Sequence, residues 1–238
     1  MNTIKKTAAD FLQSYQMDVD DIDFQANLDI FAEQMEKGLA GQDSSLKMIP
    51  TYLSAANTVP ADKRVIVADA GGTHFRAATL YFDADRNPVI ENLQKFTMPG
   101  VEKKLGRDAF FQTMAAYFKD VADASGRIGF CFSYPVEMHP NRDGRLIFFA
   151  KEIKAPEVVG EMIGENLAKT MESMGLGSRK NIVILNDTAA TLLAGIGYRN
   201  RQFSFEPFRT TPPNTGLNAP CAAAIMTTKM ITGPVISR

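Results

Sequence analysis

RVIVADAGGTHFRAATLYFD, residues 64–83, places two apolar stretches on either side of a Gly-Gly pair. A third apolar stretch, PVIENLQKFTM, begins at Pro88 after a polar turn. All three stretches contain β-branched and aromatic residues, and glycine or polar residues separate them, which is typical of strands joined by short turns. The sequence therefore predicts three consecutive antiparallel strands.

Beyond these strands, helical and extended patterns alternate. Residues 108–124 and 156–174 carry apolar side chains at helical spacing, which predicts two helices. IGFCFSYP, residues 128–135, and NIVILND, residues 181–187, contain apolar runs typical of buried strands, and RLIFFA, residues 145–150, predicts a further hairpin element. The fold class that follows is α/β, with a mixed sheet of about five strands flanked by helices.

Two segments flank this α/β region. Residues 3–40 carry apolar residues near helical spacing, which predicts a packed amphipathic helix. From residue 202 onward the chain is rich in Pro, Thr and Ala and has no clear periodicity, so no regular structure is predicted there. We therefore expect an N-terminal helical segment over residues 1–58, an α/β domain over residues 59–201, and an atypical tail, truncated or irregular, over residues 202–238.

Composition argues against several classes of function. Lys and Arg total 26 against 27 for Asp and Glu, so the net charge of -1 argues against nucleic acid or an anionic membrane as a partner. Cys131 and Cys221 form neither a CxxC metal motif nor a disulfide framework, and no apolar run is long enough to span a bilayer. These features predict a soluble, cytoplasmic protein with small-molecule ligands, and they do not indicate its oligomeric state.

The turn from Asp69 to Thr73 is the first candidate site. Its two glycines leave backbone N–H groups unshielded, so these groups and the Thr73 hydroxyl can donate to phosphate oxygens. Asp69 could hold a magnesium ion through its water shell, with Arg76 adding positive charge nearby. The alternative is an ordinary two-glycine hairpin turn. The chain has no GxxxxGK(S/T) motif and no helix pattern after the glycines, which argues against a P-loop and against a dinucleotide fingerprint.

A second candidate site follows the apolar run that ends at residue 185. A carboxylate at the carboxyl edge of a sheet faces the crevice where open α/β sheets bind ligands, and Asp187 could there accept a proton from a hydroxyl as a general base. Asn186 and Asp187 are equally residues that cap helices, and taken alone capping is the better interpretation. Ser133 and Lys151 also follow extended segments, with a turn serine and a solvated lysine as the alternatives.

Five segments, in the same order and with similar spacing, resemble the hexokinase family of the actin-like ATPase superfamily over about residues 46–197. LKMIPTYL resembles the family's segment ahead of the first strand, and VADAGGTHFRAATL resembles its first phosphate loop. FCFSYP resembles its sugar-binding strand end, and AKEIKAPEVVG resembles the segment with a sugar-binding Thr-Lys pair. NDTAATLLAG resembles the stretch with the catalytic base.

The resemblance implies a ribonuclease H-like (actin-like ATPase) fold and the ATP-dependent phosphorylation of a glucose-like hexose to hexose 6-phosphate, the first step of glycolysis. ATP and Mg²⁺ are the implied cofactors. Asp187 would be the catalytic base, and the implied sugar contacts are Ser133, Lys151, Asn186 and Asp187. The implied ATP-phosphate contacts are Asp69, Gly71, Gly72, Thr73 and Arg76, with Asp69 also holding Mg²⁺ through water.

The chain departs from the family pattern in three places. The family usually has Asn where this chain has His74, and Thr where it has Ala150. Beyond Arg201 the family's second phosphate loop and adenosine pocket are not recognisable, so we expect a truncated chain that is inactive alone. Two alternatives to a hexose kinase are a non-catalytic hexokinase-like sugar-binding or regulatory protein, and a different actin-like ATPase that shares only the phosphate turn.

Overall fold

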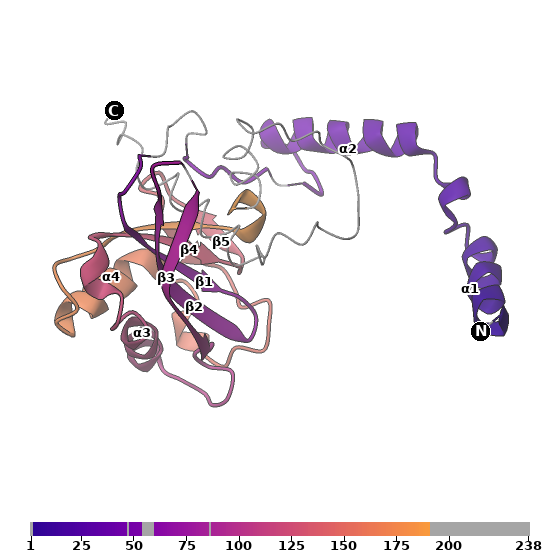
Figure 1. The fold of residues 1–238 in the computed structure, drawn as a ribbon. Helices are drawn as coiled ribbons and strands as arrows, with labels where there is room; N and C mark the ends of the chain where they lie inside the picture. Colours follow the sequence, from indigo (N-terminus) through magenta and orange to yellow (C-terminus); the bar gives the residue numbers. More distant parts are fainter. Residues whose placement is uncertain (1, 47, 54–59, 86, 191–238) are drawn as a thin grey trace. The chain divides into compact units, whose positions relative to one another are not determined.

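The computed structural model describes residues 2–46, 48–53, 60–85 and 87–190, and the chain divides into two compact units, residues 1–50 and 51–238 (Figure 1). Within those described ranges, no helix has the length and apolar character needed to cross a bilayer. The expected boundary at residue 58 stays a prediction, and the expected tail over residues 202–238 lies outside the described residues.

In the N-terminal unit, the predicted helix is two helices joined by a short 3-10 turn. These elements are α1 (Asn2–Ser14), η1 (Val19–Asp21) and α2 (Phe24–Leu39). α2 begins where it does because the Asp23 carboxylate caps it, accepting the Ala26 N–H at 2.9 Å. The prediction of a packed helix is also wrong, because no residue of α2 is buried.

The second unit is built on a five-stranded mixed sheet in the order β3-β2-β1-β4-β7. The first three strands along the chain are antiparallel neighbours, whereas β4 is parallel to β1 and β7 is parallel to β4. This arrangement confirms the predicted α/β class and the three consecutive antiparallel strands. The strands are β1 (Val65–Ala70), β2 (His74–Phe82), β3 (Pro88–Thr97), β4 (Arg127–Phe132) and β7 (Asn181–Leu185).

Two helices, α3 (Arg107–Ala116) and α4 (Ile163–Ser173), lie on the same side of this sheet (Figure 1). The core is rich in aromatic side chains. Phe75 of β2 makes edge-to-face contacts with Phe118 and with Phe130 of β4, at ring-centroid distances of 5.6 and 5.7 Å. Such contacts add to the burial of apolar area, so the aromatic core gives the sheet a firm support.

Both helices are shorter than predicted. The segment predicted as a helix over 156–174 starts with a 3-10 turn, η3 (Pro156–Val158), and α4 begins only at Ile163. Between them Gly160 has a φ of +87°, a left-handed conformation that interrupts the helix. In the segment predicted as a helix over 108–124, α3 ends at Ala116, turns follow, and the segment closes with η2 (Ala122–Ala124).

A short hairpin, β5 (Val136–Met138) and β6 (Gly144–Leu146), confirms the additional element expected near RLIFFA, although β6 ends at Leu146. Asp143, in its turn, is 5% exposed, and its carboxylate accepts the N–H groups of Gly144 and Gly164 at 2.7 Å and of Glu165 at 2.8 Å. The last two belong to the first turn of α4, whose own N-cap residue makes no side-chain cap. Asp143 therefore caps α4 from outside the helix.

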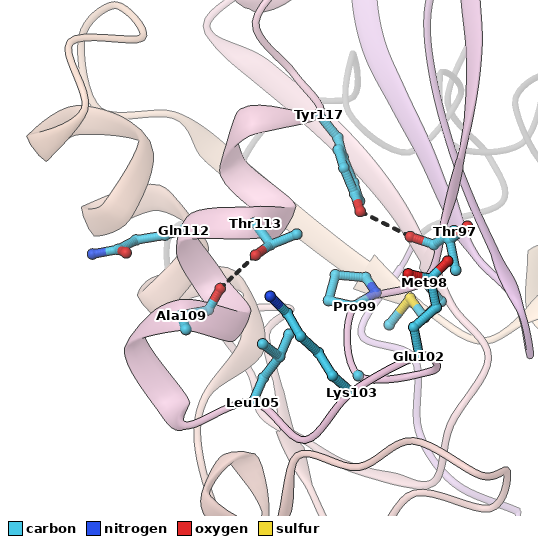
Figure 2. Close-up of a pocket in the computed structure, with 11 residues that line it drawn as sticks. Thr97, Met98, Pro99, Glu102, Lys103, Leu105, Ala109, Gln112, Thr113 and Tyr117 are labelled. Carbon is cyan, nitrogen blue, oxygen red and sulfur yellow. Dashed lines mark hydrogen bonds between the residues drawn. The ribbon is translucent and has the colours of Figure 1, made fainter.

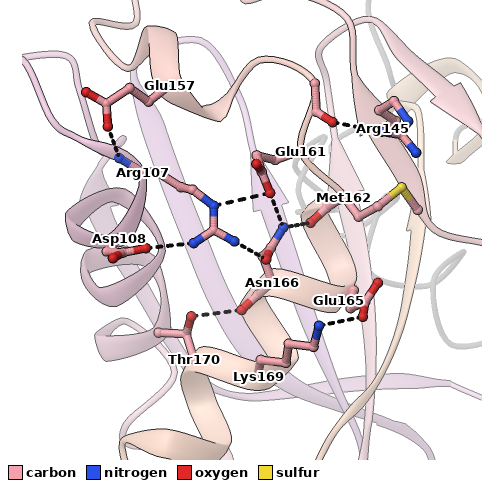
Figure 3. A network of polar contacts seen from close by, with 11 residues as sticks. Arg107, Asp108, Arg145, Glu157, Glu161, Met162, Glu165, Asn166, Lys169 and Thr170 are labelled. Atoms are coloured by element: carbon pink, nitrogen blue, oxygen red, sulfur yellow. Dashed lines mark hydrogen bonds and ion pairs between the residues drawn. The ribbon is translucent and has the colours of Figure 1, made fainter.

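The start of α3 is joined to the start of α4 by the polar network in Figure 3. The Arg107 guanidinium donates to Asn166 at 2.6 Å and forms ion pairs with Glu161 at 3.2 Å and with Asp108 at 2.6 Å. Glu157 of η3 accepts the Arg107 backbone N–H at 3.2 Å, which pairs one of the orphan donors at the start of α3. The network thus ties the N-terminal ends of the two helices together.

A pocket of about 300 Å³ lies between the end of β3, the following loop and α3 (Figure 2). Met98, Leu105 and Tyr117 contribute to its lining, and the Tyr117 hydroxyl donates to the Thr97 carbonyl at 2.9 Å. None of the residues predicted to bind sugar or phosphate lines this pocket. The candidate site is therefore built elsewhere, at the edge of the sheet.

Candidate active site

Most of the predicted site residues lie at or just beyond the carboxyl ends of the three parallel strands β1, β4 and β7. The strand register pairs Asp69 of β1 with Cys131 of β4, and Cys131 with Leu185 of β7. Paired residues in neighbouring strands share a face of the sheet, as do residues two apart along one strand. Asp69 and Cys131 therefore lie on one face, and Ser133 and Asp187 come just beyond the ends of β4 and β7.

Cys131 links the two acids that the kinase hypothesis needs. Burial, and after it the negative charges of Asp69 and Asp187, raises the pKa of the Cys131 thiol to about 12, while the contact with Ser133 lowers it. A charge shifts a neighbour's pKa only over a short range, because the interaction weakens with distance and with screening. Asp69 and Asp187 thus act on the same thiol, as two groups at one edge of the sheet would.

The turn between β1 and β2 is tight, as its glycines predict, and its backbone N–H groups fall into two kinds. Gly71 donates its N–H to the His74 carbonyl at 3.0 Å, which closes the turn and uses that donor. Within the described part of the chain, the N–H groups of Gly72 and Thr73 donate to no protein acceptor. These two amides are the donors that the turn can offer to phosphate oxygens.

Gly72 is where a side chain approaches the turn closely. A Cβ at this position would lie 2.7 Å from the Lys151 Cδ, whereas a Cβ at Gly71 would meet only the His74 carbonyl oxygen at 3.6 Å. Neither glycine has a positive φ. A side chain at Gly72 would therefore require the flexible Lys151 side chain to move, and neither glycine is needed for a left-handed turn.

Asp69 and Arg76 form an ion pair across the antiparallel β1–β2 pair. Their side chains are 20% and 29% exposed, and Arg76 Nη1 lies 2.7 Å from Asp69 Oδ2. Arg76 thus contacts the acid at the start of the turn. A carboxylate has about four lone-pair sites, so Asp69 can accept Arg76 and still accept a water from a hydrated cation. This donor set fits Mg²⁺, which usually keeps several of its waters.

Ser133 and Lys151 lie at the same edge. The Ser133 backbone N–H donates to the Ala70 carbonyl at 3.2 Å, which continues the pairing of the two strands past the end of β4. Lys151 is exposed, and its Nζ lies 5.5 Å from the centre of the Tyr134 ring. The structure therefore brings Lys151 next to the glycine turn, although the two are far apart in sequence.

At the end of β7, the capping interpretation is correct for Asn186. Its side-chain oxygen accepts the Thr188 N–H at 2.8 Å, and its carbonyl accepts the Ala190 N–H at 2.8 Å, so the chain turns into a helix at Asp187. Asp187 is exposed on the first turn of that helix, and its Oδ1 also accepts the Thr188 N–H at 2.8 Å. Capping does not exclude a chemical role, because the N-terminal end of a helix stabilises a carboxylate that faces solvent.

Two of the departures from the family pattern, His74 and Ala150, lie near this edge but differ in their contacts. The His74 Nδ1 lies 2.9 Å from the Thr73 hydroxyl oxygen, so the histidine extends the turn's own polar contacts. Ala150 is exposed and precedes Lys151. Sequence reasoning did not single out Tyr134 within FCFSYP. A tyrosine directly after a buried strand was the available signal, because a buried phenol requires a hydrogen-bond partner.

A sequence model of the family described as Hexokinase matches residues 8–196. The chain belongs to the hexokinase family. The resemblance carried by the five sequence segments is thereby confirmed.

Hexokinase-family relatives match the same part of the chain. Glucokinase-1 of Kluyveromyces lactis is 28% identical over 186 residues, covering 69% of this chain and 38% of the relative. Hexokinase-2 of Oryza sativa subsp. japonica is 31% identical over 180 residues, covering 70% of this chain and 36% of the relative. The chain thus spans less than two fifths of the length of these relatives.

A solved structure, a hexokinase from Schistosoma mansoni complexed with glucose, matches with a TM-score of 0.58 and 24% identity, over 73% of this chain and 40% of that one. At this level of identity the likeness shows the fold. The likeness supports the predicted α/β fold, a mixed sheet flanked by helices, which this chain shares with the matched hexokinase structure.

Proposed function

We propose that this hexokinase-family chain carries the base, several sugar contacts and the first phosphate turn of an ATP-dependent hexose kinase, the enzyme of the first step of glycolysis. The observation that supports this proposal is the strand register, which pairs Asp69 with Cys131 and Cys131 with Leu185, so that Asp69 and Asp187 lie at the same carboxyl edge of the sheet. Phosphoryl transfer to an alcohol requires a hydroxyl, a base and a held phosphate in one place. A turn and a base that share one edge meet that requirement.

On the sugar side, Asp187 accepts the proton of the reacting hydroxyl at its carboxylate. Asn186 uses its side-chain oxygen to cap the helix, so its amide N–H₂ group is the part that donates to a sugar oxygen. The Ser133 hydroxyl, directly after β4, and the Lys151 ammonium, beside the glycine turn, supply further hydrogen bonds. Together these groups orient the sugar so that one hydroxyl faces the base.

On the phosphate side, the Gly72 and Thr73 N–H groups and the Thr73 hydroxyl donate to phosphate oxygens, while the Gly71 N–H holds the turn closed. Asp69 would hold hydrated Mg²⁺, which when bound neutralises part of the phosphate charge. Arg76 keeps the Asp69 carboxylate in place through the ion pair at 2.7 Å. Arg76 is thus proposed to act through Asp69.

The proposed ligands are therefore a glucose-like hexose, ATP and Mg²⁺, with no role for nucleic acid or membrane. The net charge of -1 and the absence of a disulfide pattern in the sequence support these ligands and a cytoplasmic location.

The test compares wild type with Asp187→Asn in two assays. Calorimetry is expected to show glucose binding with dissociation constants within a few-fold of one another, because the amide keeps the size and much of the polarity of the carboxylate. Transfer from radiolabelled ATP to glucose is then measured for both proteins at the same protein concentration. Whatever rate is measured should fall by about 10²-fold or more in Asp187→Asn, since a general base contributes that much.

Three results decide the matter. A loss of transfer with preserved glucose affinity supports the proposed base. Equal transfer by both proteins contradicts it. Glucose binding by both proteins, with no transfer detected in either, favours the alternative of a non-catalytic sugar-binding or regulatory protein.

A further inference from the structure

Tyr134 lies where the sugar side and the phosphate side of the proposed site meet. Its side chain is 2% exposed, and its hydroxyl lies 2.7 Å from the Gly71 carbonyl oxygen and 3.4 Å from that of Gly72. A buried tyrosine hydroxyl needs such a partner. Burial, followed by the nearby charge of Asp69, raises the pKa of Tyr134, so the phenol stays a neutral donor. The carbonyl side of the glycine turn is thus held by one side chain.

The same ring contacts the segment that carries Lys151. The Lys151 Nζ lies 5.5 Å from the ring centre, and the Phe149 ring packs edge-on against the Tyr134 ring at 5.2 Å and 86°. The aliphatic part of Lys151 passes so close to Gly72 that a Cβ there would lie 2.7 Å from its Cδ. Tyr134 therefore contacts the segment holding the predicted sugar lysine and the turn holding the predicted phosphate donors.

We propose that Tyr134 is a positioning residue that couples Lys151 to the glycine turn, so that sugar binding and nucleotide binding favour each other. The inference rests on the proposed kinase function. The Tyr134 hydroxyl holds the Gly71 carbonyl, and this fixes the orientation of the turn from which the Gly72 and Thr73 N–H groups project. A sugar that draws Lys151 into one position also fixes the surface against which Gly72 packs, and a nucleotide on the turn does the reverse.

Tyr134→Phe removes only the hydroxyl and keeps the ring, and Tyr117→Phe is a matched control. Tyr117 also donates its hydroxyl to a backbone carbonyl, that of Thr97 at 2.9 Å, and lines the pocket of Figure 2. Thr97 pairs with His74 across the β2–β3 ladder, so this variant loses its bond on the neighbouring strand, whereas Tyr134→Phe loses its bond to the turn itself. Both variants lose one tyrosine-to-carbonyl hydrogen bond, so their thermal stabilities show the general cost of that loss. Effects found only in Tyr134→Phe belong to the glycine turn.

The first measurement is hydrogen exchange of the Gly71 amide in the 238-residue chain without ligand. This N–H donates to the His74 carbonyl and closes the turn. It is expected to exchange about fivefold faster in Tyr134→Phe, the factor that corresponds to one ordinary hydrogen bond. Tyr117→Phe should leave it unchanged. An unchanged Gly71 rate in Tyr134→Phe would overturn the positioning role.

The second measurement is the glucose dissociation constant with and without a magnesium complex of a non-hydrolysable ATP analogue. Wild type and Tyr117→Phe should bind glucose at least about fivefold more tightly with the nucleotide, and Tyr134→Phe should bring this ratio close to one. An unchanged ratio in Tyr134→Phe, with wild type binding both ligands, overturns the coupling role alone. Failure of wild type to bind either ligand overturns the kinase proposal and with it the coupling role.

Discussion

Asp143 gives the sharpest test of how this domain is held together. The carboxylate comes from the β5–β6 turn and caps α4, and the neighbouring Arg142 carbonyl accepts the Ile184 N–H of β7 at 2.9 Å. A Cβ at Gly164 would lie 2.8 Å from the Asp143 Oδ1, so this glycine is needed to admit the carboxylate. Asp143→Ala removes the acceptor and leaves the surrounding backbone as it is.

The expected cost follows from the three donors that lose their partner. Asp143 Oδ1 accepts the buried N–H groups of Gly144 and Gly164, and Oδ2 accepts the partly buried N–H of Glu165. An unpaired buried donor costs roughly 1–3 kcal/mol and a partly buried one less, so we expect Asp143→Ala to lower the free energy of unfolding by about 3 kcal/mol. Asp143→Asn keeps an oxygen for the two buried donors and should lose about half as much.

The assay is urea unfolding of wild type and both variants, followed by far-ultraviolet circular dichroism. Asp143→Ala within about 1 kcal/mol of wild type, or less destabilised than Asp143→Asn, would refute the reasoning. The pH dependence adds a second check. Burial raises the pKa of Asp143 above its ordinary value of 3.8 and outweighs the three N–H donors, which lower it.

The sign of the pH effect follows from that shift. As the pH falls, folded Asp143 binds its proton before unfolded Asp143 does, so its contribution to stability is full below the ordinary pKa. That contribution is lost as the pH rises through the higher folded value. The stability advantage of wild type over Asp143→Asn, which does not titrate, should therefore shrink as the pH is raised from about 4 to 7.

Two further predictions concern the sheet edge. Gly72→Ala should displace Lys151 and weaken glucose binding, measured by calorimetry, by about fivefold. Gly71→Ala should leave glucose binding unchanged, because its new Cβ meets nothing closer than 3.6 Å. Equal effects of the two substitutions would contradict the argument that Lys151 packs against Gly72. Cys131 is 1% exposed, and the pKa of its thiol is raised to about 12. At pH 8 it should therefore react with iodoacetamide at least about a hundred times more slowly than an unperturbed thiol. Peptide mapping, which separates Cys131 from Cys221, measures the rate. Rapid alkylation of Cys131 in the folded protein would show that the thiol is not buried between the strands.

Local patterns predicted the strands well and the helix ends poorly. Runs such as NIVIL are apolar because both faces of a central strand are covered, so the run itself marks the strand. The predicted helix over 156–174 failed at its beginning because Gly160 interrupts it and because the cap of α4, Asp143, comes from another part of the chain. The prediction of one N-terminal helix over residues 3–40 was wrong in the middle of the segment. Asp23 caps a second helix there, but the apolar periodicity of the segment suggested that the first helix continued.

The chemistry of the candidate residues followed from their types and order, because acids, glycines and a hydroxyl at strand ends have a restricted set of uses. Which of them act together depended on strand register, since only pairing in space puts Asp69 and Cys131 side by side and carries β7 to the same edge. The register of β1 and β2 also places Arg76 opposite Asp69, and the two side chains form an ion pair.

Long-range contacts decided the rest. Tyr134 reaches the carbonyl of Gly71, 63 residues earlier in the chain, and Lys151 packs against Gly72. The sequence alone was enough for the fold class and the family, because periodicity and local motifs lie along the chain. The partners of Tyr134, Lys151 and Asp143 emerged only in the folded protein, because packing brings together residues whose separation along the chain carries no trace of their contact.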